Sequence, residues 1–297
     1  VASNGHVLAM MASSSGMSPY GQLKQRWGGM TGLGLLKQLR EAIKSPAALK
    51  GLAEQLKAIH QLVLQQQRQY LLVAEKDNID GFAATMGSVF PSQQAPLQTN
   101  NIFDYQPQLE SINHCWTAAT QVSFCAKAYP TVTGSHVDAA ALTLLGGILR
   151  NGYLHRTIRE QGGAYGGGAS QDSHTGAFRF FSYRDPRIEG TLNDFDQSIQ
   201  WALDKPIGGD KIEEAVLGVI GSMDKPSSPA GEAIQSFYSE LNGRNRQTQT
   251  EFRQRILNVS EADIKRVAAE YLTPEKAQTA VITNSELAVD TGLDIIS

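Results

Sequence analysis

One stretch of the chain joins a long helical pattern to a strand through two adjacent glycines. Residues 136–161 carry apolar side chains at steps of three and four, the period of an amphipathic helix. The stripe consists of Val137, Ala141, Leu144, Leu145, Ile148, Leu149, Leu154 and Ile158. We expect Ser135 to cap the start of this helix, whereas Gly162 and Gly163 can adopt the left-handed conformation that ends one. Arg159 in the last turn and Tyr165 at the start of the next strand should then face one cleft.

The same residue types also occur for ordinary structural reasons. An arginine near a helix C-terminus is favoured by the helix dipole, by about 0.3–1 kcal/mol at a surface, and tyrosine is common at the start of a strand. Taken alone, the residues therefore leave a structural role open for Arg159 and Tyr165. The glycines do not predict a phosphate-binding loop, because the Gly-Lys-Ser/Thr ending is missing and the glycines follow a helix instead of preceding one.

Composition excludes two classes of partner. The formal net charge is -3 and the lysines and arginines do not cluster, so we expect no nucleic-acid partner. The chain has no run of 18 or more apolar residues and no charged-then-apolar leader, so we expect a soluble protein without a membrane partner. The compartment stays open, with the cytoplasm favoured over an organelle matrix or the periplasm.

The order of the expected elements predicts an α+β fold in which helices pack on an antiparallel sheet. Strands are expected at about 114–128, 165–171, 177–184 and 277–283, and helices at about 136–161, 192–204, 211–223, 230–242, 248–257 and 261–272. Capping patterns are expected at Thr191 with Asp194, Asp210 with Glu213, Ser260 with Asp263, and Ser228-Pro229, with Gly243 as a helix stop.

The first 95 residues are expected to be helix-rich. One helix is marked by leucines from Leu35 to Leu39, and a second begins at Ser45-Pro46. A short strand is expected at 70–75 and another within residues 2–11, and residues 91–113 are read as a connecting segment.

The two cysteines, Cys115 and Cys125, are expected on one face of a single strand at 114–128. At ~3.3 Å per residue they would lie about 33 Å apart, too far for a disulfide. We therefore interpret both as small buried residues.

A family resemblance rests on two long motifs. The run Ile158 to Gly168, followed by Asp172-Ser173-His174-Thr175-Gly176-Ala177-Phe178 and Phe181-Ser182-Tyr183-Arg184-Asp185-Pro186, resembles the C-terminal half of the presequence protease branch of the pitrilysin/insulinase zinc metallopeptidases. A looser resemblance extends from about Trp116 to Leu272. It implies one complete C-terminal family domain at 96–297 and part of a related third domain at 1–95. We also expect the sequence, which starts at Val1, to begin partway through a domain.

The resemblance implies a role for each site residue. In this family zinc binds to a His-x-x-Glu-His motif in the N-terminal half, and the C-terminal half adds an arginine and a tyrosine. These would be Arg159, which would hold substrate carbonyls or a carboxylate, and Tyr165, which would donate to the oxyanion of the tetrahedral intermediate. Asp185 and Asp194 are read as a turn residue and a capping residue and not as general bases.

The chain departs from the family pattern because no two of its histidines frame x-x-Glu. They are His6, His60, His114, His136, His155 and His174. The expected cofactor is therefore zinc bound by the N-terminal half, with no metal ligand in this chain, which should be inactive alone. The expected partners are a peptide substrate and the N-terminal half of the same polypeptide.

The function predicted for the whole protein is a zinc metalloendopeptidase that degrades unstructured peptides. The alternative is a non-catalytic structural or peptide-presenting subunit of the same fold. The intact pair Arg159 and Tyr165 argues against the alternative, and a His-x-x-Glu-His motif upstream would exclude it.

Overall fold

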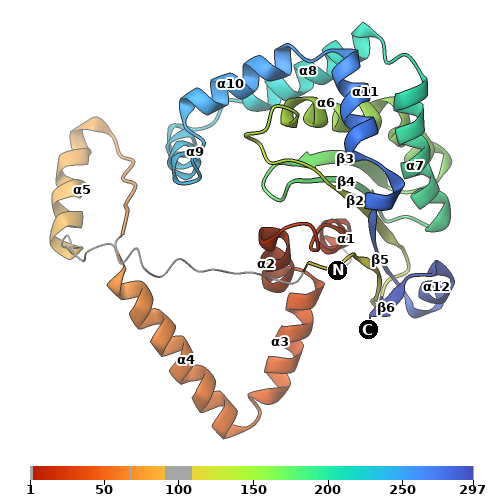
Figure 1. The fold of residues 1–297 in the computed structure, drawn as a ribbon. Helices are drawn as coiled ribbons and strands as arrows, with labels where there is room; N and C mark the ends of the chain where they lie inside the picture. Colours follow the sequence, from red (N-terminus) through yellow and green to blue (C-terminus); the bar gives the residue numbers. More distant parts are fainter. Residues whose placement is uncertain (1–2, 67, 91–108, 297) are drawn as a thin grey trace. The chain divides into compact units, whose positions relative to one another are not determined.

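The computed structural model describes residues 3–66, 68–90 and 109–296, and Figure 1 labels its helices and strands. The chain divides into two compact units. One contains Val1–Leu35, Gln106–Asp224 and Thr250–Ser297, and the other contains Leu36–Tyr105 and Lys225–Gln249. The expected domain boundary between residues 95 and 96 falls outside the described residues, so the division into 1–95 and 96–297 remains a prediction.

The first unit is built around a six-stranded mixed sheet, drawn in Figure 1. Its strands are β1 (Asn113–Thr117), β2 (Phe124–Pro130), β3 (Gly166–Asp172), β4 (Ala177–Tyr183), β5 (Gln278–Thr283) and β6 (Asp294–Ile296), in the order β3-β4-β2-β5-β1-β6. The four strands from β3 to β5 pair antiparallel, whereas β1 is parallel to both β5 and β6. The predicted α+β class is confirmed, and so are the strands near 165–171, 177–184 and 277–283.

The single strand predicted at 114–128 is wrong, because the chain turns between β1 and β2. The Thr120 amide donates to the Ala118 carbonyl at 2.9 Å. As a result, β1 and β2 lie on opposite sides of β5, where Cys115 and Cys125 both pair in register with Val281. Two strand spacings separate the cysteines by about 10 Å instead of about 33 Å. Both thiols are buried and free, and burial raises the pKa of the Cys125 thiol.

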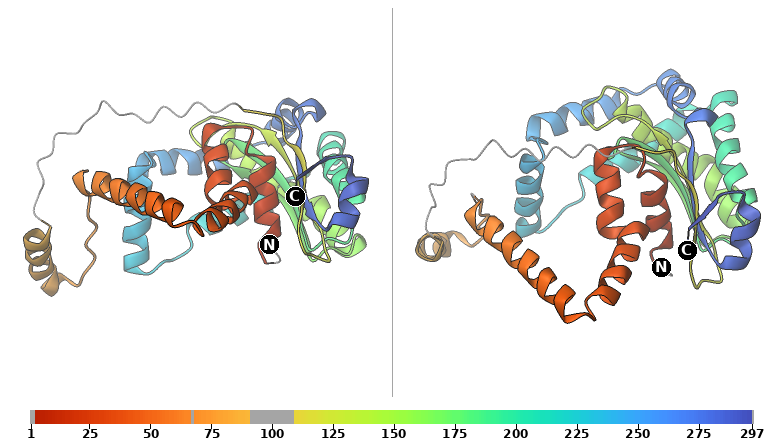
Figure 2. Two further views of the ribbon diagram at one scale, coloured as in Figure 1. Left: turned by 90° about the horizontal axis from the view of Figure 1, so that it is seen from below. Right: turned by 60° about the horizontal axis from the view of Figure 1, so that its bottom comes forward.

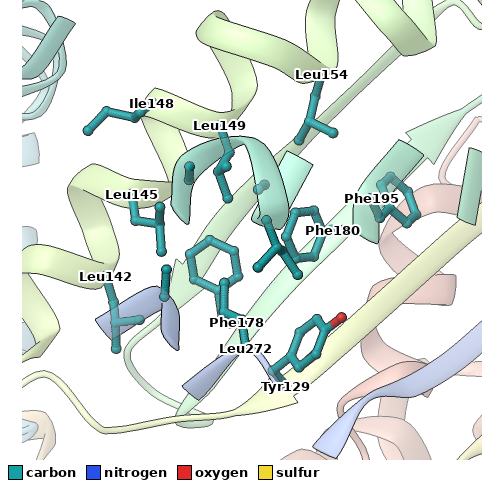
Figure 3. Packing of buried hydrophobic residues seen from close by; sticks show 14 of the residues in the cluster. Tyr129, Leu142, Leu145, Ile148, Leu149, Leu154, Phe178, Phe180, Phe195 and Leu272 are labelled. Atoms are coloured by element: carbon teal, nitrogen blue, oxygen red, sulfur yellow. The ribbon is translucent and has the colours of Figure 1, made fainter. Parts of the chain in front are cut away.

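One face of the sheet is covered by a long helix. The helix runs as α6 (Ala139–Leu149) and continues as a π-helical segment, η1 (Arg150–Gln161). Figure 3 shows leucines of this helix above the aromatic rings of β2 and β4, including Phe178 and Phe180, all of them buried. The predicted stripe is therefore the core face of the helix, except for Val137, which precedes it and is exposed. Ser135 is not the cap, since Asp138 occupies the N-cap position.

Further helices complete both faces of the sheet. α7 (Glu189–Asp204), α8 (Gly209–Met223) and α11 (Glu261–Tyr271) lie with α6. On the other face, α1 (Gly5–Ser13) contacts β2, β4 and β5 (Figure 2), and α2 (Pro19–Gly28) follows it in the chain. The strand expected within residues 2–11 is therefore wrong. A short apolar run does not distinguish a helix from a strand, and small residues such as Gly5 and Ala9 let this helix approach Phe124.

The remaining long helices carry few buried side chains. They are α3 (Met30–Ala42), α4 (Pro46–Gln65), α5 (Lys76–Val89), α9 (Pro229–Leu241) and α10 (Arg246–Leu257). The helix expected from Ser45-Pro46 is confirmed as α4. The strand predicted at 70–75 is wrong, because residues 68–75 form no ladder with any described strand. Tyr70 instead packs against Phe90, with ring centroids 5.2 Å apart.

The chain ends in short elements beside the sheet: η2 (Pro274–Lys276), α12 (Ser285–Ala288) and η3 (Val289–Thr291). Within the described ranges we find no helix that is both long enough and apolar enough to cross a membrane.

Three of the five predicted helix signals are confirmed. Ser260 and Asp263 form a complete capping box on α11, Ser228 accepts from the Gly231 amide at the start of α9, and Gly243 has a positive φ of 68° after α9. Two are wrong. α7 begins before Thr191, whose hydroxyl bonds Asp185 instead, and α8 is capped by Gly208.

Candidate functional site

Arg159 and Tyr165 lie at the two ends of one tight turn, as the sequence predicts. Arg159 belongs to the last turn of η1, and Tyr165 immediately precedes β3, the edge strand of the sheet. The turn is closed by two backbone hydrogen bonds, from the Gly163 amide to the Arg159 carbonyl at 3.3 Å and from the Ala164 amide to the Ile158 carbonyl at 3.1 Å. Gly163 has a φ of 79°, which a glycine adopts without strain. Ile158 and Ala164 are buried and anchor the turn.

The polar ends of both side chains are free of partners among the described residues. Tyr165 is 67% exposed and Arg159 is also exposed. Across the described part of the chain, neither the Tyr165 hydroxyl nor the Arg159 guanidinium has a hydrogen bond or ion pair. A phenol can donate one proton, and a guanidinium offers five N–H donors in a fixed plane. The turn therefore presents a phenol and a guanidinium that no partner within the described ranges occupies.

The Tyr165 ring is steadied by the end of β4. Its backbone amide donates to the Tyr183 carbonyl at 3.1 Å, and its ring meets the Tyr183 ring edge-on, with centroids 5.6 Å apart. Tyr183 in turn contacts the His6 ring at 4.7 Å and lies under the Arg184 guanidinium at 5.4 Å. Burial lowers the pKa of His6, which favours the neutral imidazole in this aromatic contact. Arg184 has a φ of 50°, a strained value for a residue with a side chain.

Arg187 supports the turn through its guanidinium, although it is not one of the two site residues, Arg159 and Tyr165, expected from the sequence. Its Nη2 donates to the Thr157 carbonyl at 3.3 Å and to Asp194 Oδ2 at 2.8 Å. The first of these bonds satisfies a carbonyl in the last turn of η1. A Cβ on Gly162 would lie 1.9 Å from the same nitrogen, so the guanidinium fills the space that a side chain would need. Asp194 is therefore an ion-pair partner and not the helix cap that the sequence predicts.

Asp185 fixes the loop that carries Arg187. The carboxylate is fully buried; Oδ1 accepts from the Arg187 amide at 2.9 Å and Oδ2 from the Thr191 hydroxyl at 2.7 Å. Its backbone pairs with Ser123 in both directions, at 2.8 and 2.9 Å. With its two oxygens engaged in this way and no exposure, Asp185 holds the loop, in agreement with its interpretation as a turn residue.

Two of the three glycines after Tyr165 allow close packing, whereas a Cβ on Gly166 would meet no atom within 4 Å. A Cβ on Gly167 would lie 2.8 Å from Ile158 Cγ2, and one on Gly168 would lie 3.3 Å from Arg150. Both contacts are with η1, so the missing side chains let the edge strand approach the helix that carries Arg159. This packing gives the glycine run a structural reason that does not involve a phosphate.

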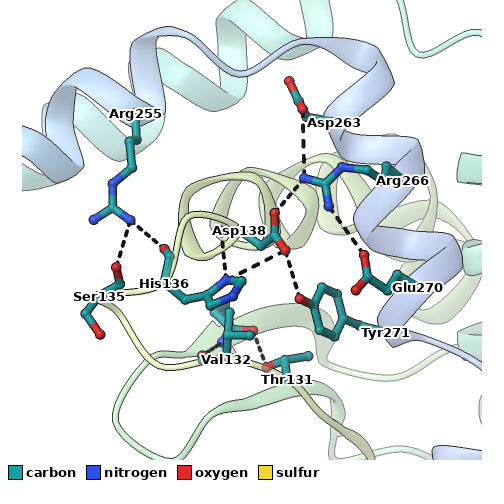
Figure 4. A network of polar contacts seen from close by, with 11 residues as sticks. Thr131, Val132, Ser135, His136, Asp138, Arg255, Asp263, Arg266, Glu270 and Tyr271 are labelled. Atoms are coloured by element: carbon teal, nitrogen blue, oxygen red, sulfur yellow. Dashed lines mark hydrogen bonds and ion pairs between the residues drawn. The ribbon is translucent and has the colours of Figure 1, made fainter.

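A second polar cluster lies at the opposite end of the long helix, shown in Figure 4. Asp138 accepts from Arg266 Nη2 at 2.5 Å and from the Tyr271 hydroxyl at 2.8 Å. Hydrogen bonding from Arg266 lowers the pKa of Asp138, and burial followed by the Asp138 carboxylate raises the pKa of Tyr271 to about 12. Arg255 Nη1 donates to the carbonyls of Ser135, at 3.3 Å, and His136. Because the Asp138 carboxylate is buried and hydrogen-bonded by two partners, this cluster joins α11 to α6 and offers little to a ligand.

Zinc does not fit the residues that the structure describes. No three His, Cys, Asp or Glu side chains gather in an arrangement that could hold a metal ion within residues 3–66, 68–90 and 109–296. A catalytic zinc requires about three protein ligands. This part of the chain therefore provides no site for the ion.

Comparisons with known proteins identify the family. Residues 114–286 match the sequence model described as the PreP C-terminal domain. The chain is 29% identical over 276 residues to the mitochondrial presequence protease of Yarrowia lipolytica, covering 92% of this chain and 27% of that protein. It is 32% identical over 301 residues to the corresponding protein of Schizosaccharomyces pombe, covering 95% and 28%. The chain thus spans little more than a quarter of the length of these relatives.

Solved structures share the fold at low identity. A protease from Helicobacter pylori superposes with a TM-score of 0.52 at 16% identity, over 60% of this chain and 45% of that one. A structure described as a peptidase M16 inactive domain, from Pseudomonas fluorescens, gives 0.51 at 17% identity, over 71% and 52%. These likenesses show the fold alone. The match over residues 114–286, which is more than half of the chain, shows that the chain belongs to the PreP C-terminal domain family.

Proposed function

We propose that this chain is the C-terminal part of a zinc metalloendopeptidase that degrades unstructured peptides. In this proposal Arg159 binds the substrate and Tyr165 stabilises the oxyanion that forms on the scissile carbonyl. The observation that carries it is the turn 159–165, which has a hydrogen-bonded backbone and presents an exposed guanidinium and an exposed phenol, neither with a partner in the part of the chain that the structure describes. Relatives that match more than nine-tenths of the chain bear the name presequence protease.

Each side chain suits the task that the proposal gives it. The planar Arg159 guanidinium can donate hydrogen bonds to two oxygens at once, either those of two peptide carbonyls or those of one carboxylate. The Tyr165 hydroxyl can donate one hydrogen bond to an oxygen that gains negative charge, and such a bond strengthens as the transition state forms. Neither group must first break a hydrogen bond or ion pair within the described residues.

The proposal places the zinc ion in the N-terminal half of the polypeptide, since the described residues supply no set of ligands. That half would provide the metal chemistry and the general base, whereas this chain holds the substrate. The curated relatives are named as mitochondrial proteins, so we propose an organelle location in preference to the cytoplasm that the sequence alone favours.

The decisive experiment compares wild type with Tyr165→Phe in the full-length protein. An unstructured fluorogenic peptide is the substrate and zinc is present. Removal of one oxyanion donor should lower kcat on the order of 100- to 1000-fold. Tyr238→Phe is the matched control, because this tyrosine is also exposed but lies on α9. Wild-type turnover in Tyr165→Phe would remove the role of Tyr165, and an inactive wild type would favour a non-catalytic, peptide-presenting subunit.

A further inference from the structure

The positions of Arg159 and Tyr165 depend on the backbone between them. Neither polar group is held by a hydrogen bond or ion pair with a described side chain, and the edge contact of Tyr165 with Tyr183 fixes only one ring. The direction in which each side chain leaves the surface is therefore set by the turn itself. Whatever holds this turn also determines the separation of the two backbone positions from which the guanidinium and the phenol extend.

Three features place Arg187 at this turn. Its Nη2 donates to the Thr157 carbonyl, two residues before Arg159. The same nitrogen occupies the space beside Gly162, where a Cβ would lie at 1.9 Å, within the residues that reverse the chain. A cation at the C-terminal end of a helix is also favoured by the helix dipole. The guanidinium thus contacts the turn both before and after Arg159.

Arg187 is itself fixed from two directions. Its guanidinium pairs with Asp194 on α7 at 2.8 Å, and the Asp194 side chain is only 17% exposed. Its backbone amide is held at 2.9 Å by the buried Asp185, which also accepts from Thr191 on α7. The N-terminal half of α7, the segment after β4 and the end of η1 therefore meet at Arg187.

We propose that Arg187 is a positioning residue that sets the geometry of the turn 159–165 and thereby places Arg159 and Tyr165 against the substrate. The inference rests on the proposed function. It adds that Arg187 does not touch the substrate and acts only through the turn. A displacement of about 1 Å at such a turn is enough to reduce turnover on the order of 100-fold.

The test introduces Arg187→Met into two forms of the full-length protein, the wild type and the double variant Arg159→Ala/Tyr165→Phe. Arg187→Met should lower kcat on the order of 100-fold, and Arg187→Lys, which keeps the positive charge but loses the planar guanidinium, should give an intermediate loss. In the Arg159→Ala/Tyr165→Phe background, Arg187→Met should have almost no further effect, because the turn then carries nothing to misplace. A residue with only a structural role would cause the same loss in both backgrounds, and that result would overturn the inference.

A matched control separates positioning from general stability. Lys127 makes a similar, partly buried ion pair with α7. Its Nζ donates to Asp196 at 2.7 Å and to the Leu192 carbonyl at 3.4 Å, and neither acceptor belongs to the turn. Lys127→Met should reduce the unfolding temperature and leave kcat close to that of wild type. Equal kinetic losses in Lys127→Met and Arg187→Met would overturn the inference.

A measurement that does not depend on activity completes the design. Amide hydrogen exchange of the peptide spanning residues 158–165 should be roughly tenfold faster in Arg187→Met than in wild type or Lys127→Met. If Arg187→Met does not fold, Asp194→Asn can replace it, because this change removes only the ionic partner of Arg187. It should also speed exchange of this peptide, by a smaller factor. Unchanged exchange overturns the positioning role even if Tyr165→Phe is inactive. If exchange is faster but Tyr165→Phe is fully active, Arg187 does hold the turn in place. That combination overturns the proposed function instead.

Discussion

The two ends of the helix formed by α6 and η1 use similar residues for opposite purposes. At the N-terminal end, the Asp138 carboxylate is buried and bonded by Arg266 and Tyr271. At the C-terminal end, Arg159 and Tyr165 are exposed and their polar groups have no described partner. At the first end the polar groups hold α11 against α6. At the second end the polar groups are available to a ligand, and other residues hold the backbone that carries them.

The comparison shows that residue type does not distinguish a structural cluster from a site. Each end contains an arginine and a tyrosine near the helix, and each is close to further charged groups. The difference lies in whether the polar atoms are already satisfied. Mutations should therefore separate the ends, with effects on stability at one and on turnover at the other.

The largest expected effect on stability is at the N-terminal end. Asp138→Ala removes two hydrogen bonds to a carboxylate and leaves the Tyr271 hydroxyl without its acceptor, so we expect the free energy of unfolding to fall by about 2–4 kcal/mol. Urea unfolding monitored by circular dichroism measures this change. Glu270→Ala is the control, since its pair with Arg266 is exposed and should contribute less than about 0.5 kcal/mol. A cost for Asp138→Ala as small as that of the control would break the comparison.

At the C-terminal end the same kind of truncation should spare the fold. Arg159→Ala removes an exposed guanidinium, so the free energy of unfolding should change by less than about 0.5 kcal/mol. Loss of a hydrogen bond from a charged group to the substrate should lower kcat/KM of the full-length protein by roughly 10- to 100-fold. Steady-state kinetics with the unstructured peptide measures this loss. A destabilised variant with normal kinetics would show that Arg159 is structural after all.

Local signals explain why the turn could be predicted from the sequence. The apolar period of residues 136–161, the two glycines and the strand pattern that follows Tyr165 each act over only a few residues. The three strands β3, β4 and β5 were found for the same reason. The capping box at Ser260 and Asp263 is also local, and it formed as predicted.

The errors arose where tertiary contacts decide the outcome. The bend between β1 and β2 contains neither glycine nor proline, so nothing in the sequence marks the end of β1. The apolar run in α1 is too short for its period to be read, and its helical form depends on packing against Phe124. The link between Arg187 and the turn joins two positions thirty residues apart, Arg187 and Thr157, and no local pattern predicts such a contact.

The pH dependence of stability should also differ between the ends. The Asp138 pKa is lowered below its ordinary value of 3.8, chiefly by Arg266, so its carboxylate stabilises the fold fully above that value. This contribution is lost as the pH falls through the lower, folded pKa. The difference in unfolding free energy between wild type and Asp138→Asn should therefore be constant near neutral pH and shrink below about pH 4. Acid titrations of both proteins, followed by urea unfolding at each pH, test this; a difference that grows on acidification would contradict it.

The smallest expected effect sharpens the role of α11, which carries Arg266 and Tyr271 to the N-terminal end. Ser260 accepts a hydrogen bond from the Asp263 amide and Asp263 Oδ2 accepts one from the Ser260 amide, so both bonds of the capping box are present. Ser260→Ala should cost about 1 kcal/mol. Ser45 precedes α4 without a side-chain cap bond, so Ser45→Ala should be nearly neutral in the same unfolding assay. Equal costs would mean that the bonds at Ser260 add nothing, and that α11 is held to α6 by Asp138 and its apolar face alone.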